Sequence, residues 1–113
     1  MARFCPLFSG SSGNSIYIGN NDGGILVDTG MSAKKIGEAL FNIGIAPESL
    51  NAVFVTHEHS DHIKGLRVFA SKYHIKVYGT NGTLSALDDM GILNGKFETE
   101  EVSFSGNEAG PLL

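Results

Sequence analysis

The segment Thr56-His57-Glu58-His59-Ser60-Asp61-His62 decides the fold, and it directly follows an apolar run at 52–55. The segment holds three of the four histidines of the chain together with one aspartate. Imidazole nitrogen and carboxylate oxygen are ligands that suit zinc, manganese or iron in proteins. The alternative interpretation is a solvated polar loop, but dense histidine clusters are typical of metal binding. The segment therefore predicts a metal site.

The spacing within this segment is compatible with two ions. In an extended chain His57 and His59 point to the same side, because side chains alternate with period two. The chain must then turn, and the adjacent Asp61 and His62 point in different directions. One pair can hold a first ion while Asp61 and His62 begin the ligand set of a second. Two ions about 3.5–4 Å apart are the arrangement that clamps attacking and leaving oxygens in hydrolysis.

The residues before the motif predict strands and one helix. Apolar runs at 4–8, 16–18 and 25–27 are separated by glycine-rich turns, and the last two form a hairpin pattern. Helical spacing then appears at Ile36, Ala39, Leu40 and Ile43. Ser32 is a suitable N-cap for this helix and Gly44 a suitable residue to end it. The run at 52–55 is typical of a strand covered on both faces.

After the motif, the pattern alternates between helix and strand. We expect a helix from about His62 or Ile63 to Ser71, then a strand at 76–78. A helix capped by Thr80 or Thr83 should follow and end at Gly91, and one more strand is predicted at 102–104. This order predicts a mixed sheet with helices packed on it.

Length and composition limit the class of protein. The chain has 113 residues, 42% of them apolar and 18% charged, which indicates one globular domain or less. A net charge of −4 argues against a protein that coats nucleic acid by bulk charge, but not against an enzyme that meets phosphate through a bound metal. The single Cys5, the lack of an apolar stretch of about 18 residues and the lack of a secretion signal predict a cytoplasmic protein without a membrane segment.

Three segments resemble those of a known family. Residues 56–65, Thr-His-Glu-His-Ser-Asp-His-Ile-Lys-Gly, resemble the signature of the metallo-β-lactamase-fold superfamily, and residues 26–30, Leu-Val-Asp-Thr-Gly, resemble its earlier motif. Residues 8–15, Phe-Ser-Gly-Ser-Ser-Gly-Asn-Ser, look more narrowly like the YycJ/WalJ-type bacterial branch of metal-dependent hydrolases with nuclease activity. The resemblance extends to about residue 100.

The resemblance implies a mixed α/β (α+β) fold, the four-layer αββα sandwich, with a dinuclear site at the edge of its two sheets. By the family pattern, His57 and His59 ligate the first metal ion, and Asp61 and His62 the second. A hydroxide bridging the two ions, Zn or Mn, is the expected nucleophile, and Asp61 orients it or accepts its proton. Asp28 is expected to fix a loop or a ligand histidine without touching metal.

The sequence also departs from the family pattern. The superfamily expects a third histidine, a bridging aspartate and a last histidine in a C-terminal half, and these are absent. We therefore expect residues 1–113 to be the N-terminal half of a single domain. Two protein ligands per ion predict weak metal binding and doubtful catalysis by this piece alone.

Two further features are compatible with a phosphate-containing substrate. Ser12, Gly13 and Asn14 lie in a glycine-rich turn that either contacts substrate through its amides and hydroxyls or is only a tight turn. A basic cluster follows the motif and either steers a phosphodiester or is an ordinary solvated surface; it comprises Lys64, Arg67, Lys72 and Lys76.

The sequence thus predicts a metal-dependent hydrolase, a phosphodiesterase or nuclease whose partner is a phosphodiester such as nucleic acid. One alternative is a thioester or lactone hydrolase of the same fold, of the glyoxalase II type. Another is a non-catalytic truncated module. A module of that kind is expected to expose an apolar face and to form homo-oligomers through its unpaired half.

Overall fold

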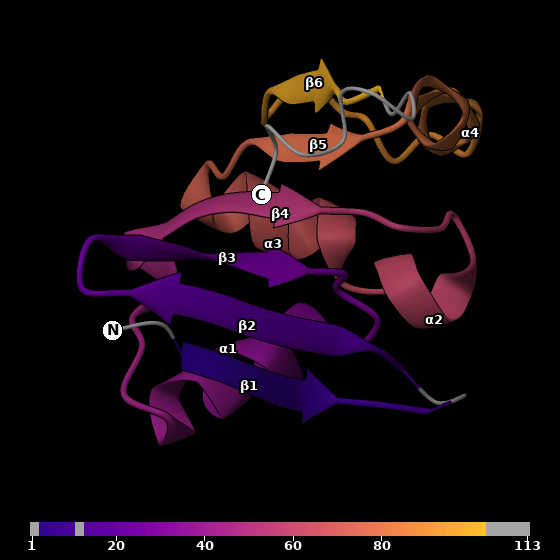
Figure 1. Cartoon of the computed structure of the whole chain (residues 1–113). Helices are drawn as coiled ribbons and strands as arrows, with labels where there is room; N and C mark the ends of the chain where they lie inside the picture. Colours follow the sequence, from indigo (N-terminus) through magenta and orange to yellow (C-terminus); the bar gives the residue numbers. More distant parts are fainter. Residues whose placement is uncertain (1–2, 11–12, 104–113) are drawn as a thin grey trace.

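The computed structural model describes residues 3–10 and 13–103, which form one six-stranded sheet whose strands lie in chain order (Figure 1). The strands are β1 (Arg3–Phe8), β2 (Ser15–Asn20), β3 (Gly23–Val27), β4 (Leu50–Phe54), β5 (Val77–Gly79) and β6 (Thr99–Glu101). β1, β2 and β3 pair antiparallel, whereas β3 to β6 pair parallel. The predicted hairpin and the predicted mixed sheet are both confirmed.

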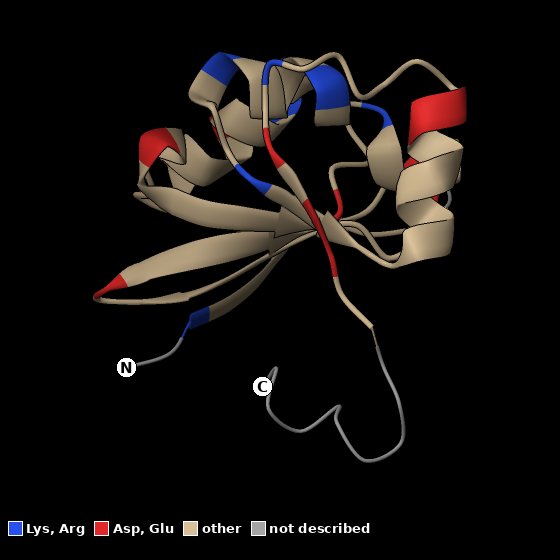
Figure 2. Cartoon of the chain, turned by 90° about the horizontal axis from the view of Figure 1, so that it is seen from above, with Lys and Arg blue, Asp and Glu red and all other residues tan. Residues whose placement is uncertain are grey.

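Helices make the crossovers between the parallel strands. They are α1 (Ala33–Asn42), α2 (Ser60–Ile63), α3 (Leu66–Tyr73) and α4 (Asn81–Asp89), with a 3-10 helix, η1, at Pro47–Ser49. Figures 1 and 2 show α1 and α3 on the same face of the sheet. Because parallel strands all run in one direction, the loops that follow β3, β4 and β5 leave from one edge of the sheet. The metal motif lies in the loop after β4.

The core lies between the sheet and these two helices. Neighbouring strands place Tyr17, Leu26, Val53 and Val77 in one registered row, and all four are buried. The helices cover this row with the largest fully buried side chains of α1 and α3, which are Ile36, Leu40, Leu66 and Phe69.

The opposite face of the sheet is also apolar, but it is less covered. Ile16, Val27, Phe54 and Tyr78 are in register there, and each is half-buried in the described part of the chain. The rings of Phe54 and Tyr78 stack with centroids 5.0 Å apart. The expectation that 52–55 is covered on both faces therefore holds on the helical side and only partly on the other.

The predicted caps of two helices are confirmed. The side chain of Ser32 accepts a hydrogen bond from the Lys35 amide at the start of α1, and Gly44 follows that helix with φ +78°. Thr80, rather than Thr83, caps α4, and its hydroxyl accepts from the Thr83 amide at 3.3 Å. These local signals were sufficient because capping uses residues only three positions apart.

Two predicted elements are wrong in their bounds. The single helix expected from His62 or Ile63 to Ser71 is instead α2 and α3, interrupted at 64–65. Gly65 lies so close to the backbone of Met31 that a Cβ there would overlap its carbonyl oxygen. The last strand, expected at 102–104, is β6 at Thr99–Glu101, and Phe104 lies outside the described residues.

The edge strand β6 is held by an ion pair as well as by its ladder. Lys76 Nζ lies 2.6 Å from Glu100 Oε1. This hydrogen bond raises the pKa of the Lys76 ammonium above its usual value. Lys76 also lies over the Tyr78 ring, 5.4 Å from its centroid. Within the predicted basic cluster, Lys76 is therefore already paired.

Among the described residues, no helix has both the length and the apolar character needed to cross a membrane.

Candidate metal centre

The predicted ligands meet at the edge where the parallel strands β3 and β4 end. Asp28 follows β3, whereas His57 and His59 lie in the loop after β4. The backbone amide of Asp28 donates to the Phe54 carbonyl at 2.7 Å, which keeps the two loops side by side. Sites at the carboxyl ends of parallel strands are common because several loops converge there.

Three histidine rings lie together at this edge. The His57 ring centroid is 4.9 Å from that of His62 and 6.0 Å from that of His59. His62 comes from the short helix α2, which turns the chain back toward β3. The structure thus brings together residues that the motif places up to five positions apart.

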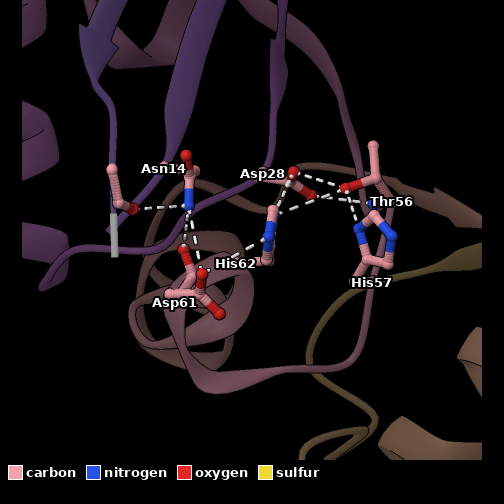
Figure 3. A network of polar contacts seen from close by, with 7 residues as sticks. Asn14, Asp28, Thr56, His57, Asp61 and His62 are labelled. Atoms are coloured by element: carbon pink, nitrogen blue, oxygen red, sulfur yellow. Dashed lines mark hydrogen bonds and ion pairs between the residues drawn. The ribbon is translucent and has the colours of Figure 1, made fainter. Parts of the chain in front are cut away.

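A buried carboxylate, Asp28, organises this cluster. Asp28 is 4% exposed and has φ +68°, a left-handed conformation that aspartate tolerates better than most residues. Its Oδ1 accepts from the Thr56 amide at 2.8 Å, and its Oδ2 accepts from the Thr56 hydroxyl at 2.6 Å. Oδ2 is also 2.7 Å from Nδ1 of His62 (Figure 3). A carboxylate only accepts, so His62 donates from Nδ1, and in a neutral ring this leaves the Nε2 lone pair available to a metal ion.

Asp61 and His62 present two ligand atoms at a separation that suits one ion. Oδ2 of Asp61 lies 3.6 Å from Nε2 of His62. Two ligands of a tetrahedral zinc ion, each about 2.1 Å from it, lie about 3.4 Å apart. The free Nε2 and the carboxylate therefore fit a divalent cation, in donor chemistry as well as in spacing.

Asn14 also holds Asp61 in place. The Asn14 side-chain amide donates to the Asp61 carbonyl at 3.2 Å and to its carboxylate at 3.3 Å (Figure 3). The backbone amide of Asn14 donates to the same carbonyl at 2.8 Å. The loop before β2 is thereby attached to α2, although 47 residues separate the two in the chain.

Gly30 makes this close approach feasible. Its amide donates to the Asn14 carbonyl at 2.8 Å. A Cβ at this position would overlap the Asp61 carbonyl oxygen and the Asn14 nitrogen. Glycine is therefore required where three segments of the site meet.

The predicted site residues differ in their surroundings. His57, Asp61 and His62 lie together, Asp28 contacts His62, and the His59 ring lies 6.0 Å from the His57 ring. Gly13 is buried next to Met31 and Asn14 faces Asp61, while Ser12 lies outside the described residues. Within 3–10 and 13–103, no three His, Cys, Asp or Glu side chains form a group that could hold one ion.

Sequence reasoning overlooked two residues of this centre. Thr56 links Asp28 to the motif, and the relevant signal was its position between the buried strand and the first histidine. Gly30 carries the close contact with Asp61, and its signal was the Asp-Thr-Gly sequence after a strand.

The sequence of this chain is similar to that of a known family and of characterised proteins. A family model described as the metallo-beta-lactamase superfamily matches residues 9–89. The exodeoxyribonuclease WalJ of Streptococcus pneumoniae serotype 2 is 42% identical over 99 residues, which are 88% of this chain and 36% of that protein. The exodeoxyribonuclease YycJ of Bacillus anthracis is 44% identical over 89 residues, 78% of this chain and 33% of that protein. The chain spans about a third of the length of these relatives.

Solved structures agree on the fold. A diphosphatase from the PhnP family superposes with a TM-score of 0.71 at 20% identity, over 92% of this chain and 51% of that one. A beta-lactamase from Chitinophaga pinensis superposes with a TM-score of 0.69, also at 20% identity, over 82% of this chain and 40% of that one. The predicted mixed α/β class and the predicted resemblance are both confirmed.

Proposed function

The chain belongs to the metallo-beta-lactamase superfamily, and from this premise we propose that it carries the metal-binding motif of a nuclease that hydrolyses phosphodiester bonds in DNA. The superfamily implies divalent metal ions. The observation that carries the proposal is the cluster at the ends of β3 and β4, where Asp61 Oδ2 and His62 Nε2 lie 3.6 Å apart beside the His57 ring. DNA is favoured as substrate because two similar relatives are named exodeoxyribonucleases.

Each residue of the cluster has a proposed role. His57 and His59 hold a first ion, and Asp61 and His62 hold a second, with zinc or manganese as the ions that suit these ligands. When bound, such ions lower the pKa of water and neutralise charge on a phosphodiester. The carboxylate of Asp61 orients the attacking water and accepts its proton. Asp28 keeps the His62 ring in the orientation that exposes Nε2.

The chain is proposed to supply the N-terminal half of one metallo-beta-lactamase domain. Its coverage of about a third of the relatives supports this assignment, as does the apolar sheet face that carries Val27 and Phe54. Ligands from the other half would complete both ion sites, since the described residues contain no group of three ligands around one ion. We further propose a cytoplasmic location, which a lone free thiol at Cys5 supports.

Metal content and DNA cleavage test this function together. The wild-type chain and the His59→Ala variant are dialysed against Mn²⁺ or Zn²⁺ and analysed for bound metal, then incubated with 5′- or 3′-labelled single-stranded DNA. His74→Asn is the matched control, because His74 is an exposed histidine outside the cluster whose φ of +53° asparagine tolerates.

We expect bound metal in the wild type and in His74→Asn, and less of it in His59→Ala, which lacks one proposed ligand of the first ion. In a longer protein that also contains the remaining ligands, shortening of the labelled DNA should follow the same pattern. Equal metal content in all three proteins would overturn the ligand assignment. Bound metal with DNA left intact, in a protein that also contains the remaining ligands, would overturn the nuclease proposal.

A further inference from the structure

The Thr56 hydroxyl lies between a buried carboxylate and a proposed metal ligand. Its Oγ1 is 2.6 Å from Oδ2 of Asp28 and 3.0 Å from Nδ1 of His57 (Figure 3). The hydroxyl thereby connects Asp28 to a ring that Asp28 does not contact directly.

The direction of each hydrogen bond follows from counting protons. A hydroxyl has one proton to donate, and an ionised carboxylate has none. The short contact with Asp28 therefore requires the Thr56 proton to point at Oδ2. The Thr56 oxygen is left as an acceptor toward His57, so the proton of a neutral His57 ring must lie on Nδ1.

The reverse arrangement conflicts with the geometry. If His57 Nδ1 accepted the hydroxyl proton, two oxygens without a proton between them would face each other at 2.6 Å. His62 Nδ1 is 3.4 Å from the same hydroxyl but 2.7 Å from Asp28, so its own proton goes to the carboxylate. Both rings therefore carry their proton on Nδ1.

We propose that Thr56 is a positioning residue. Its hydroxyl links the Asp28 carboxylate to the His57 ring and sets the tautomer of that ring before any ion binds. Asp28 then controls His62 directly and His57 through Thr56. In both rings the Nε2 lone pair remains free for a metal. The benefit for catalysis rests on the function proposed above, whereas the tautomer itself does not.

Thr56 is suited to this role by its backbone as well as its hydroxyl. Its amide donates to Oδ1 of Asp28 at 2.8 Å, while its hydroxyl donates to Oδ2. Thr56 is therefore bonded to both oxygens of the Asp28 carboxylate. A β-branched side chain has few χ1 rotamers, so its oxygen stays in place. The residue itself is exposed, and burial of apolar surface does not account for its presence.

The ring ¹⁵N resonances of the metal-free 113-residue chain test this proposal. Two-bond ¹H–¹⁵N spectra in the presence of a chelator, at about pH 8.5 where a free histidine side chain is neutral, distinguish the protonated from the unprotonated ring nitrogen. The variants are Thr56→Val, which keeps the shape and the amide but removes the hydroxyl, and Thr56→Ser, which restores it.

In the wild type we expect protonated Nδ1 in both His57 and His62. Thr56→Val should move His57 toward the Nε2–H form that free imidazole favours in water, and Thr56→Ser should return it. His62 is the internal control, because its bond to Asp28 does not involve the hydroxyl. Titration with Zn²⁺ should show weaker binding in Thr56→Val by about 10-fold or more.

Protonated Nε2 at His57 in the wild type would overturn the proposal, and so would an unchanged His57 tautomer in Thr56→Val. If the backbone amide spectrum shows that Thr56→Val is unfolded, the wild-type and Thr56→Ser tautomers decide the question. The expected tautomers, together with no DNA cleavage by a longer protein that also contains the remaining ligands, would support the role of Thr56 and count against the nuclease function.

Discussion

Nδ1 of His62 lies 2.7 Å from Oδ2 of Asp28, although 34 residues separate them in the chain. Asp28→Asn tests what this contact does for metal binding. Asparagine tolerates the left-handed backbone at this position, but its amide replaces one of the two acceptor oxygens with a donor. We expect affinity for Zn²⁺ or Mn²⁺ to fall about 10- to 100-fold, measured by calorimetric titration. An affinity equal to that of the wild type would show that the carboxylate does not support the ligands.

Gly30 and Gly37 provide a matched pair for testing the close approach of the loops. A Cβ at Gly30 would overlap the Asp61 carbonyl oxygen, whereas a Cβ at Gly37 in α1 would meet no atom within 4 Å. Gly30→Ala should lower the free energy of unfolding by about 1–3 kcal/mol and displace Asp61. Gly37→Ala should raise it by about 0.5–1 kcal/mol, because alanine favours a helix. Urea unfolding followed by circular dichroism measures both, and equal effects would contradict the packing described at Gly30.

Much of this site followed from the sequence because the signals were local. The His57 to His62 spacing predicted a ligand cluster, and the structure places the rings of these two histidines 4.9 Å apart. The Ser32 and Gly44 caps predicted the ends of α1, which the structure confirms. Each of these patterns involves residues within one or two helical turns of each other, so chain geometry alone relates them.

The parts that sequence reasoning did not find depend on contacts between distant residues. Gly65 interrupts the predicted helix because its backbone touches that of Met31, more than thirty positions earlier. β6 contains only Thr99, Glu100 and Glu101, so it has no apolar signal, and its place follows from pairing with β5 and from the Lys76–Glu100 contact. The role proposed for Thr56 depends on its contact with Asp28, which lies 28 positions earlier in the chain.

The Asn14 side chain provides a second test of how Asp61 is held. Asn14→Ala removes the amide that reaches the Asp61 carbonyl and carboxylate, but keeps the backbone hydrogen bond to that carbonyl. We expect a loss of about 1 kcal/mol in the free energy of unfolding. Asn42→Ala at the exposed end of α1 is the control, with an expected change within about 0.5 kcal/mol. The same loss in both variants would mean that the Asn14 contacts add nothing specific.

The less covered face of the sheet predicts self-association of the 113-residue chain. Ile25 and Leu26 are consecutive in β3 and point to opposite faces, with Leu26 fully buried under the helices and Ile25 half-buried. Ile25→Glu should leave the fold intact and shift the chain toward monomer in sedimentation velocity, because a charge on an apolar contact surface opposes association. Leu26→Glu should unfold the protein, because it buries an unpaired carboxylate in the core. A wild-type chain that is already monomeric at high concentration would refute association through this face, and an Ile25→Glu variant that stays associated would assign it to another surface.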